Sequence, residues 1–161
     1  RKDLDLRPVE GVDGTASEKV ILEKLAKFGI TPEAVTLWGT GTPMREFLWS
    51  EEMADASVHV LLNVDFRDTY REGDKEIRNC HINVGTGKEV SIREVAEKIM
   101  KEIGFRGELR WDSSKPDGTM RKLTDVSKLH GLGWHHKVEI DEGIHRLYEW
   151  YLKGICINHK N

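Results

Sequence analysis

Two short loops of this sequence carry the residue types best suited to hold a ligand. The first, residues 38–47, follows a β-rich run and contains two glycines, which let a backbone come close to a ligand. It also contains Arg45, whose planar, permanently charged guanidinium group suits bidentate phosphate binding. Spacing alone favours a simpler interpretation, a tight turn beside a core tryptophan, Trp38.

The second loop, residues 114–122, contains Pro116, Asp117 and Gly118, a combination typical of turns. The carboxylate of Asp117 suits ribose hydroxyls, and the neighbouring cations, which include Lys122, suit a diphosphate. Spacing alone again favours a surface turn with solvated cations. Taken together, however, the two loops supply the groups that a nucleotide diphosphate needs.

No complete catalytic set accompanies these loops. Gly39/Gly41 and Gly85/Gly87 each form only G-x-G, without the further glycine of a dinucleotide-binding loop, and no P-loop is present. No tyrosine is followed four positions later by lysine. The sequence therefore predicts neither catalytic nor cofactor-binding residues in this chain.

Composition excludes several other classes of protein. The net charge is -3 and the cations form no basic stripe, which argues against a nucleic-acid partner. No apolar run approaches the ~20 residues of a membrane helix. The cysteines, Cys80 and Cys156, and the scattered histidines follow no metal-ligand spacing. We therefore expect no metal, plain thiols and a cytoplasmic protein.

Hydrophobic periodicity predicts a mixed α/β chain. Capping boxes at Thr15–Glu18 and Ser91–Glu94 mark two helix starts. Helices are expected over 16–28, from Ser50 onward, over 91–104, around 125–131 and over about 140–152. Three short strands are expected over 35–38, 81–84 and 108–111, with a loop over 65–79. The expected buried face of the second helix consists of Met53, Ala54, Val58, Leu61 and Leu62.

Three motifs together resemble one enzyme family. WGTGTPMREFL at 38–48, HINVGTG at 81–87 and SKPDGTMRKLTDV at 114–126 occur in the order and spacing of the GDP-L-fucose synthases, which are extended short-chain dehydrogenase/reductases. The similarity runs from about residue 35 to 152, whereas residues 1–34 match loosely. One departure is Trp49-Ser50-Glu51-Glu52, where the family has His-Val-Asp-Asp.

The resemblance implies an architecture. Residues 35–161 would be the C-terminal sugar-nucleotide-binding domain, including a strand and a helix that pack on a Rossmann domain largely missing from this chain. Residues 1–34 would be a linker or insertion with one helix. Substrate-binding roles carry over to the motif positions Leu37, Trp38, Arg45, Asp117 and Lys122.

The resemblance also implies a reaction. The family converts GDP-4-keto-6-deoxy-D-mannose to GDP-L-fucose by epimerisation at C3 and C5 and NADPH-dependent reduction at C4. Its catalytic residues lie upstream of this segment, so we expect this chain alone to be inactive and to bind no NADPH. The expected partners are the GDP-sugar substrate, the N-terminal Rossmann domain and a second copy of the intact enzyme in a homodimer.

Two alternatives remain open. Another nucleotide-sugar epimerase or reductase of the same superfamily would share much of this pattern, although the Lys-Pro-Asp-Gly-Thr stretch argues against it. A non-catalytic binding module would share the lack of a cofactor loop.

Overall fold

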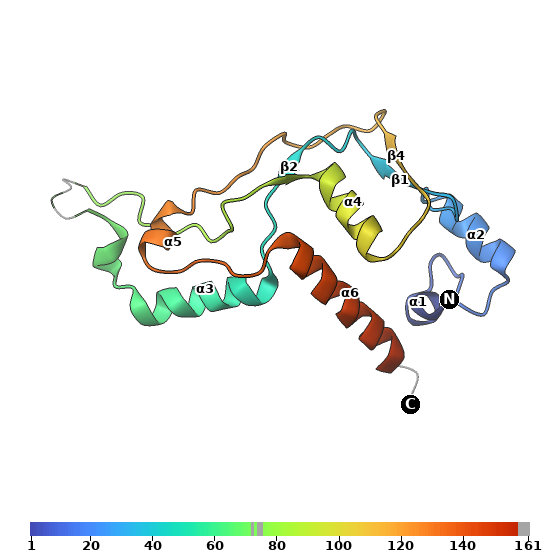
Figure 1. Ribbon diagram of the computed structural model, residues 1–161, viewed down its shortest axis with the longest axis horizontal. Helices are drawn as coiled ribbons and strands as arrows, with labels where there is room; N and C mark the ends of the chain where they lie inside the picture. Colours follow the sequence, from blue (N-terminus) through green and yellow to red (C-terminus); the bar gives the residue numbers. More distant parts are fainter. Residues whose placement is uncertain (72, 74–75, 158–161) are drawn as a thin grey trace. The chain divides into compact units, whose positions relative to one another are not determined.

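The computed structural model describes residues 1–71, 73 and 76–157, with side chains as far as Gly154 (Figure 1). The chain divides into two compact units. The first unit comprises Arg1–Pro43, Ile92–Gly118 and Ile144–Asn161, and the second comprises Met44–Ser91 and Thr119–Gly143. Each unit is built from segments that are distant in sequence.

The first unit is organised around two parallel strands. Strand β1, Ala34–Trp38, pairs in register with β4, Glu108–Asp112, from Ala34↔Glu108 to Trp38↔Asp112. The carboxyl ends of parallel neighbours lie at one edge, so the loops that follow both strands start side by side. The helices of this unit are α1 (Lys2–Leu6), α2 (Glu18–Ala26), α4 (Ile92–Glu102) and most of α6 (Ile140–Ile157).

Helix α4 turns its apolar face toward this strand pair. An apolar pocket of about 350 Å³ is lined by residues of α4, β1, β4 and their flanking segments, among them Leu37, Ile99 and Leu109. Successive strand residues point to opposite sides. Leu37 therefore lines the pocket, whereas Trp38 is 77% exposed.

The second unit has its own core. Ala56, Leu129 and Trp134 are buried together, and the indole Nε1 of Trp134 donates to Asp55 Oδ2 at 2.8 Å. Its strands β2 (Met44–Arg45) and β3 (Val90–Ser91) pair antiparallel. Its helices are α3 (Ser50–Asn63), the short 3-10 helix Phe66–Thr69, α5 (Ser127–Gly131) and the first residues of α6.

Most of the predicted elements are confirmed as helices α2 to α6 and strands β1 and β4. The strand predicted at 81–84 is wrong, because in the described chain no neighbouring strand pairs with this segment. Ile82 and Val84 instead pack on the core, and the Asn83 side chain donates to the carbonyl oxygen of Asp125 at 2.9 Å. Strands β2 and β3 were not predicted, since two residues are too short to show alternation.

Three local predictions also need correction. Ser17, not Thr15, caps α2 by accepting from the Val20 amide. The stretch predicted as a loop over 65–79 contains a 3-10 helix. The predicted buried face of α3 is exposed, because Glu52 and Ala56, one turn apart, face the core. The exposed residues of that predicted face are Met53, Ala54, Val58, Leu61 and Leu62.

The structure is thus mixed α/β, with two small sheets and several helices. Among the described residues, no helix combines the length and apolar character that a bilayer crossing needs. Cys80 is a free thiol, and the side chain of Cys156 lies outside the described residues. The predicted boundary between residues 34 and 35 stays a prediction.

Candidate functional site

The loops that follow β1 and β4 are joined through Asp117. The Thr40 amide donates to Asp117 Oδ1 at 2.9 Å, and the Thr40 hydroxyl donates to Oδ2 at 2.7 Å. These bonds, first from the hydroxyl and then from the amide, hold the pKa of Asp117 below its ordinary value. The carboxylate is therefore an exposed anion with both oxygens oriented and with lone pairs left for a ligand.

Gly39 is what lets this carboxylate approach the backbone. Its φ of +80° lies in the left-handed region, and a Cβ at this position would collide with Asp117 Oδ1. The glycine of the first motif thus serves a contact inside the protein.

Arg93, at the start of α4, holds the same loop from another direction. Its Nη2 donates to the Thr40 carbonyl oxygen at 2.8 Å, and its amide donates to the Gly41 carbonyl oxygen at 2.9 Å. Its guanidinium carbon lies 4.6 Å from the centroid of the Trp111 ring, within cation–π range. Sequence analysis did not single out Arg93, because nothing in its local pattern indicates a partner 53 positions away.

Trp38 presents an open aromatic face beside this loop. Lys115 Nζ lies 5.7 Å from the centroid of the Trp38 ring. A largely exposed indole beside a cation offers stacking and charge, and the loop that follows Trp38 holds the oriented carboxylate of Asp117. Leu37 lies on the other side of the strand, in the apolar pocket.

Arg45 and Lys122 belong to the second unit. Arg45 Nη1 donates to the carbonyl oxygens of Met44 and Thr119, both at 2.6 Å. The Met44 amide donates to the Met120 carbonyl oxygen at 2.8 Å, so β2 runs beside the segment that leads to Lys122. In the described chain no hydrogen bond uses Nη2 or Nε of Arg45.

The two cations at 121 and 122 differ in their surroundings. Arg121 is paired with Glu89, to whose Oε1 its Nε donates at 2.6 Å. Lys122 is exposed, and the described residues include no ion pair with it. The predicted site residues thus form two groups, Leu37, Trp38 and Asp117 in the first unit and Arg45 and Lys122 in the second.

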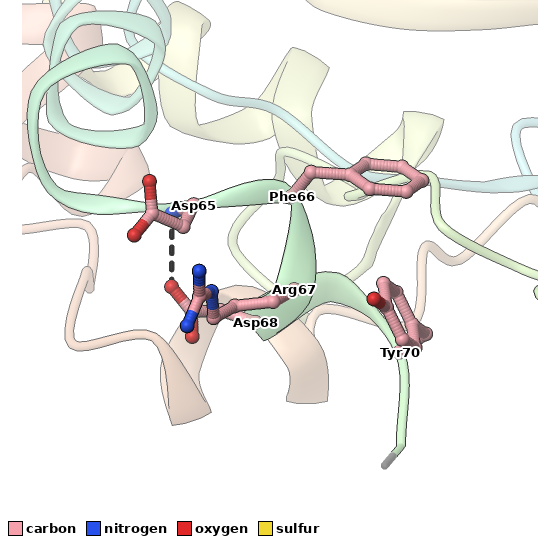
Figure 2. Close-up of a pocket in the computed structure, with 5 residues that line it drawn as sticks. All are labelled: Asp65, Phe66, Arg67, Asp68 and Tyr70. Carbon is pink, nitrogen blue, oxygen red and sulfur yellow. Dashed lines mark hydrogen bonds between the residues drawn. The ribbon is translucent and has the colours of Figure 1, made fainter. Parts of the chain in front are cut away.

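A separate, open pocket of about 680 Å³ is lined by residues of the 3-10 helix and by the residue on either side of it (Figure 2). The Phe66 and Tyr70 rings, 5.4 Å apart, lie on one side and the acids on the other. Asp65 and Asp68 form a capping box, and the Asp65 amide donates to Asp68 Oδ2 at 2.8 Å. These carboxylates are thus used by the local backbone, and no group of three or more ligands in the described chain is able to hold a metal ion.

Comparisons with known proteins identify the relatives of this chain. Residues 8–85 match the model of the NAD dependent epimerase/dehydratase family. The chain is 48% identical over 124 residues to GDP-L-fucose synthase 1 of Arabidopsis thaliana and 46% identical over 120 residues to GDP-L-fucose synthase of Escherichia coli (strain K12). The chain is homologous to the GDP-L-fucose synthases. These alignments cover 77% and 74% of the chain but only 35% and 36% of the two relatives, so the chain spans about a third of their length.

Solved structures agree with this relationship. A GDP-6-OMe-4-keto-L-xylo-heptose reductase from C. jejuni matches with a TM-score of 0.79 and 42% identity, covering 86% of this chain and 39% of that one. A UDP-glucose 4-epimerase from Thermotoga maritima matches with a TM-score of 0.60 but 21% identity, covering 77% of this chain and 36% of that one. The second match shows a shared fold alone, whereas the first extends the GDP-L-fucose synthase relationship to another GDP-sugar reductase.

Proposed function

We propose that this chain is the C-terminal, GDP-sugar-binding part of a GDP-L-fucose synthase. The observation that carries the proposal is the 46–48% identity to GDP-L-fucose synthases over about three-quarters of the chain. The oriented carboxylate of Asp117, bonded to the loop that follows Trp38, and the exposed ring of Trp38 support it, because these are groups that a nucleoside needs.

In this proposal each predicted residue acts on one part of the substrate. Trp38 forms an aromatic wall beside the nucleoside. Leu37, the residue before it, supports the base indirectly, because it packs the end of the strand from which the Trp38 side chain projects. Asp117 accepts hydrogen bonds from the ribose hydroxyls. Arg45 binds the diphosphate through the guanidinium nitrogens that its backbone contacts leave unused, and Lys122 adds a second cation.

The intact enzyme would convert GDP-4-keto-6-deoxy-D-mannose to GDP-L-fucose by 3,5-epimerisation and 4-reduction, as a cytoplasmic homodimer. NADPH would supply the hydride. The glycine loops described here do not fit its diphosphate, because Asp117 fills the space at Gly39 and Glu46 fills the space at Gly85. We therefore assign NADPH and the catalytic residues to a Rossmann domain outside this chain, which by itself would be inactive.

What this chain would contribute to the reaction is binding and orientation. Holding the nucleotide end of the substrate fixes the sugar at its other end, which converts ground-state binding into proximity for the reacting carbons. None of the residues assigned here would transfer a proton.

The test is a titration of the 161-residue chain with GDP, followed by amide chemical shifts. We expect the amide signals of residues 37–45 and 115–122 to respond together. The dissociation constant should lie in the micromolar to millimolar range, because part of the site lies outside this chain and each loss of about 1.4 kcal/mol of binding free energy raises it tenfold. Arg45→Ala should abolish the response. Lys153→Ala is the matched control, since Lys153 pairs with Glu149 on α6, away from both loops in sequence. Absence of any response at several millimolar GDP would refute a site in this chain.

A second candidate is a reductase for another GDP-linked sugar. It is favoured by the C. jejuni GDP-heptose enzymes at 42–44% identity and by the GDP-L-colitose synthase of Yersinia pseudotuberculosis at 35%. Both candidates predict GDP binding, and UDP competing equally well would contradict both. Activity of the full-length enzyme on the alternative GDP-sugars separates them. A non-catalytic binding module would bind GDP without turnover even at full length.

A further inference from the structure

Glu46, the residue after Arg45, joins three segments of the second unit. Its Oε1 accepts hydrogen bonds from the amides of Thr86 and Gly87, each at 2.6 Å. Its Oε2 accepts from the amide of Thr124 at 3.1 Å. One half-buried carboxylate thus connects the stretch after β2 with the 85–87 loop and with the segment that enters α5.

The surroundings of Glu46 are built to receive an anion. A Cβ at Gly85 would collide with Glu46 Oε1, so only glycine leaves room for the carboxylate. Burial raises the pKa of Glu46, but hydrogen bonds from Thr124, Gly87 and Thr86 outweigh it and hold the pKa below its ordinary value. The group is therefore ionised at neutral pH, and its hydrogen bonds are of the stronger, charge-assisted kind.

These contacts also restrain Arg45. Arg45 Nη1 donates to the carbonyl oxygen of Thr119, which belongs to the same segment, 119–124, that Glu46 holds through Thr124. The two consecutive side chains therefore fasten the chain at β2 to this segment at two points. Because one nitrogen of the guanidinium group is fixed to backbone, the direction of the other two follows from the position of that backbone.

We infer that Glu46 is a positioning residue that orients the Arg45 guanidinium group, and the segment bearing Lys122, for a diphosphate. The inference rests on the proposed GDP-sugar site and adds a residue that does not itself touch the ligand. An oriented cation loses less conformational freedom on binding. Loss of the Glu46 hydrogen bonds should therefore disorder the Arg45 guanidinium group and lower the affinity for GDP.

Glu46→Gln tests the inference, because glutamine keeps the size but turns an NH2 group toward a backbone donor. We expect the dissociation constant for GDP to rise about tenfold. In an Arg45→Lys background the same change should cost less than about threefold, since lysine lacks the fork that Glu46 orients. Equal losses in both backgrounds would mean that Glu46 acts through the fold alone and would overturn the inference.

Glu52→Gln is the matched control. Glu52 is also a buried carboxylate of the second unit and accepts hydrogen bonds from two backbone amides, those of Lys137 and Val138. Neither amide belongs to the segments that Glu46 and Arg45 hold. It should lower stability without a specific change in GDP affinity. A loss of affinity equal to that of Glu46→Gln would contradict the inference.

Gly85→Ala provides an independent perturbation. The added methyl group would displace the Glu46 carboxylate, although Glu46 and Arg45 themselves are not substituted. It should reproduce the tenfold loss. If neither variant folds, the unmodified chain still decides: GDP should shift the amide signals of Thr86, Gly87 and Thr124 together with the Arg45 Nε signal. A shift at Arg45 with none at the three amides would overturn the inference, whereas no response to GDP anywhere would refute the proposed function instead.

Discussion

The backbone amide of Thr40 donates a hydrogen bond of 2.9 Å to Asp117, a residue 77 positions away. The contact exists because β1 and β4 run parallel and in register, so the loops after Trp38 and Asp112 begin at the same edge. Two loops that each look like a surface turn thereby become one structure.

Asp117→Asn should weaken GDP binding about tenfold and speed amide hydrogen exchange at Thr40. An asparagine has one acceptor oxygen, so it is unable to receive both the amide and the hydroxyl of Thr40 and still serve a ribose. Titration and hydrogen exchange measure the two effects. The control is Asp125→Asn, which removes a comparable exposed acid that accepts from the Ser127 amide.

Gly39→Ala should destabilise the first unit by about 1–3 kcal/mol. The alanine would have to adopt a φ near +80° and its methyl group would meet the Asp117 carboxylate. Urea denaturation followed by tryptophan fluorescence reports the change. Gly131→Ala, where no atom lies within 4 Å of the added methyl group, should cost far less. Equal costs at the two positions would argue against the described loop geometry.

Arg93→Leu should destabilise the 39–42 loop by about 1 kcal/mol. The change removes both the bond to the Thr40 carbonyl oxygen and the cation over the Trp111 ring. Hydrogen exchange of the loop amides and thermal unfolding are the measurements. Arg110→Leu is a suitable comparison, because Arg110 pairs with Glu108 two positions away. No difference between the variants would show that Arg93 is dispensable.

His130 should make the stability of the second unit depend on pH. Burial, followed by the nearby His135 and His136, lowers the pKa of His130 below its ordinary value of 6.5. As the pH drops through ~6.5, the unfolded chain takes up the His130 proton more readily than the folded chain does, so the free energy of unfolding falls. Unfolding between pH 5 and 7.5 should show this slope.

His130→Leu should flatten that slope. His145→Gln should not, since His145 lies on α6 in contact with Glu102 and is part of the other unit. A slope unchanged in His130→Leu would assign the pH dependence to a different group.

Local sequence was sufficient for most of the longer elements and for the chemistry of single residues. Periodicity located helices α2 to α6 and strands β1 and β4 because each follows from the spacing of neighbouring apolar residues. The motifs likewise indicated the two loops and the family. Where an outcome depends on a partner distant in sequence, local pattern was not enough. The 81–84 segment has strand-like residues but no strand beside it, and the predicted apolar face of α3 is exposed because the core lies against Glu52 and Ala56.

The roles of Arg93 and Glu46, which support the two loops, are visible only in the tertiary structure. Arg93 and Glu46 look like ordinary surface charges in the sequence, since neither lies near its partners along the chain. Arg93 meets Thr40 because the start of α4 bonds to the backbone of the loop after β1, and Glu46 meets Thr124 because β2 lies beside residues 119–120. A hydrogen bond forms only when its donor and acceptor lie within about 3 Å, a distance that the fold sets and sequence spacing does not.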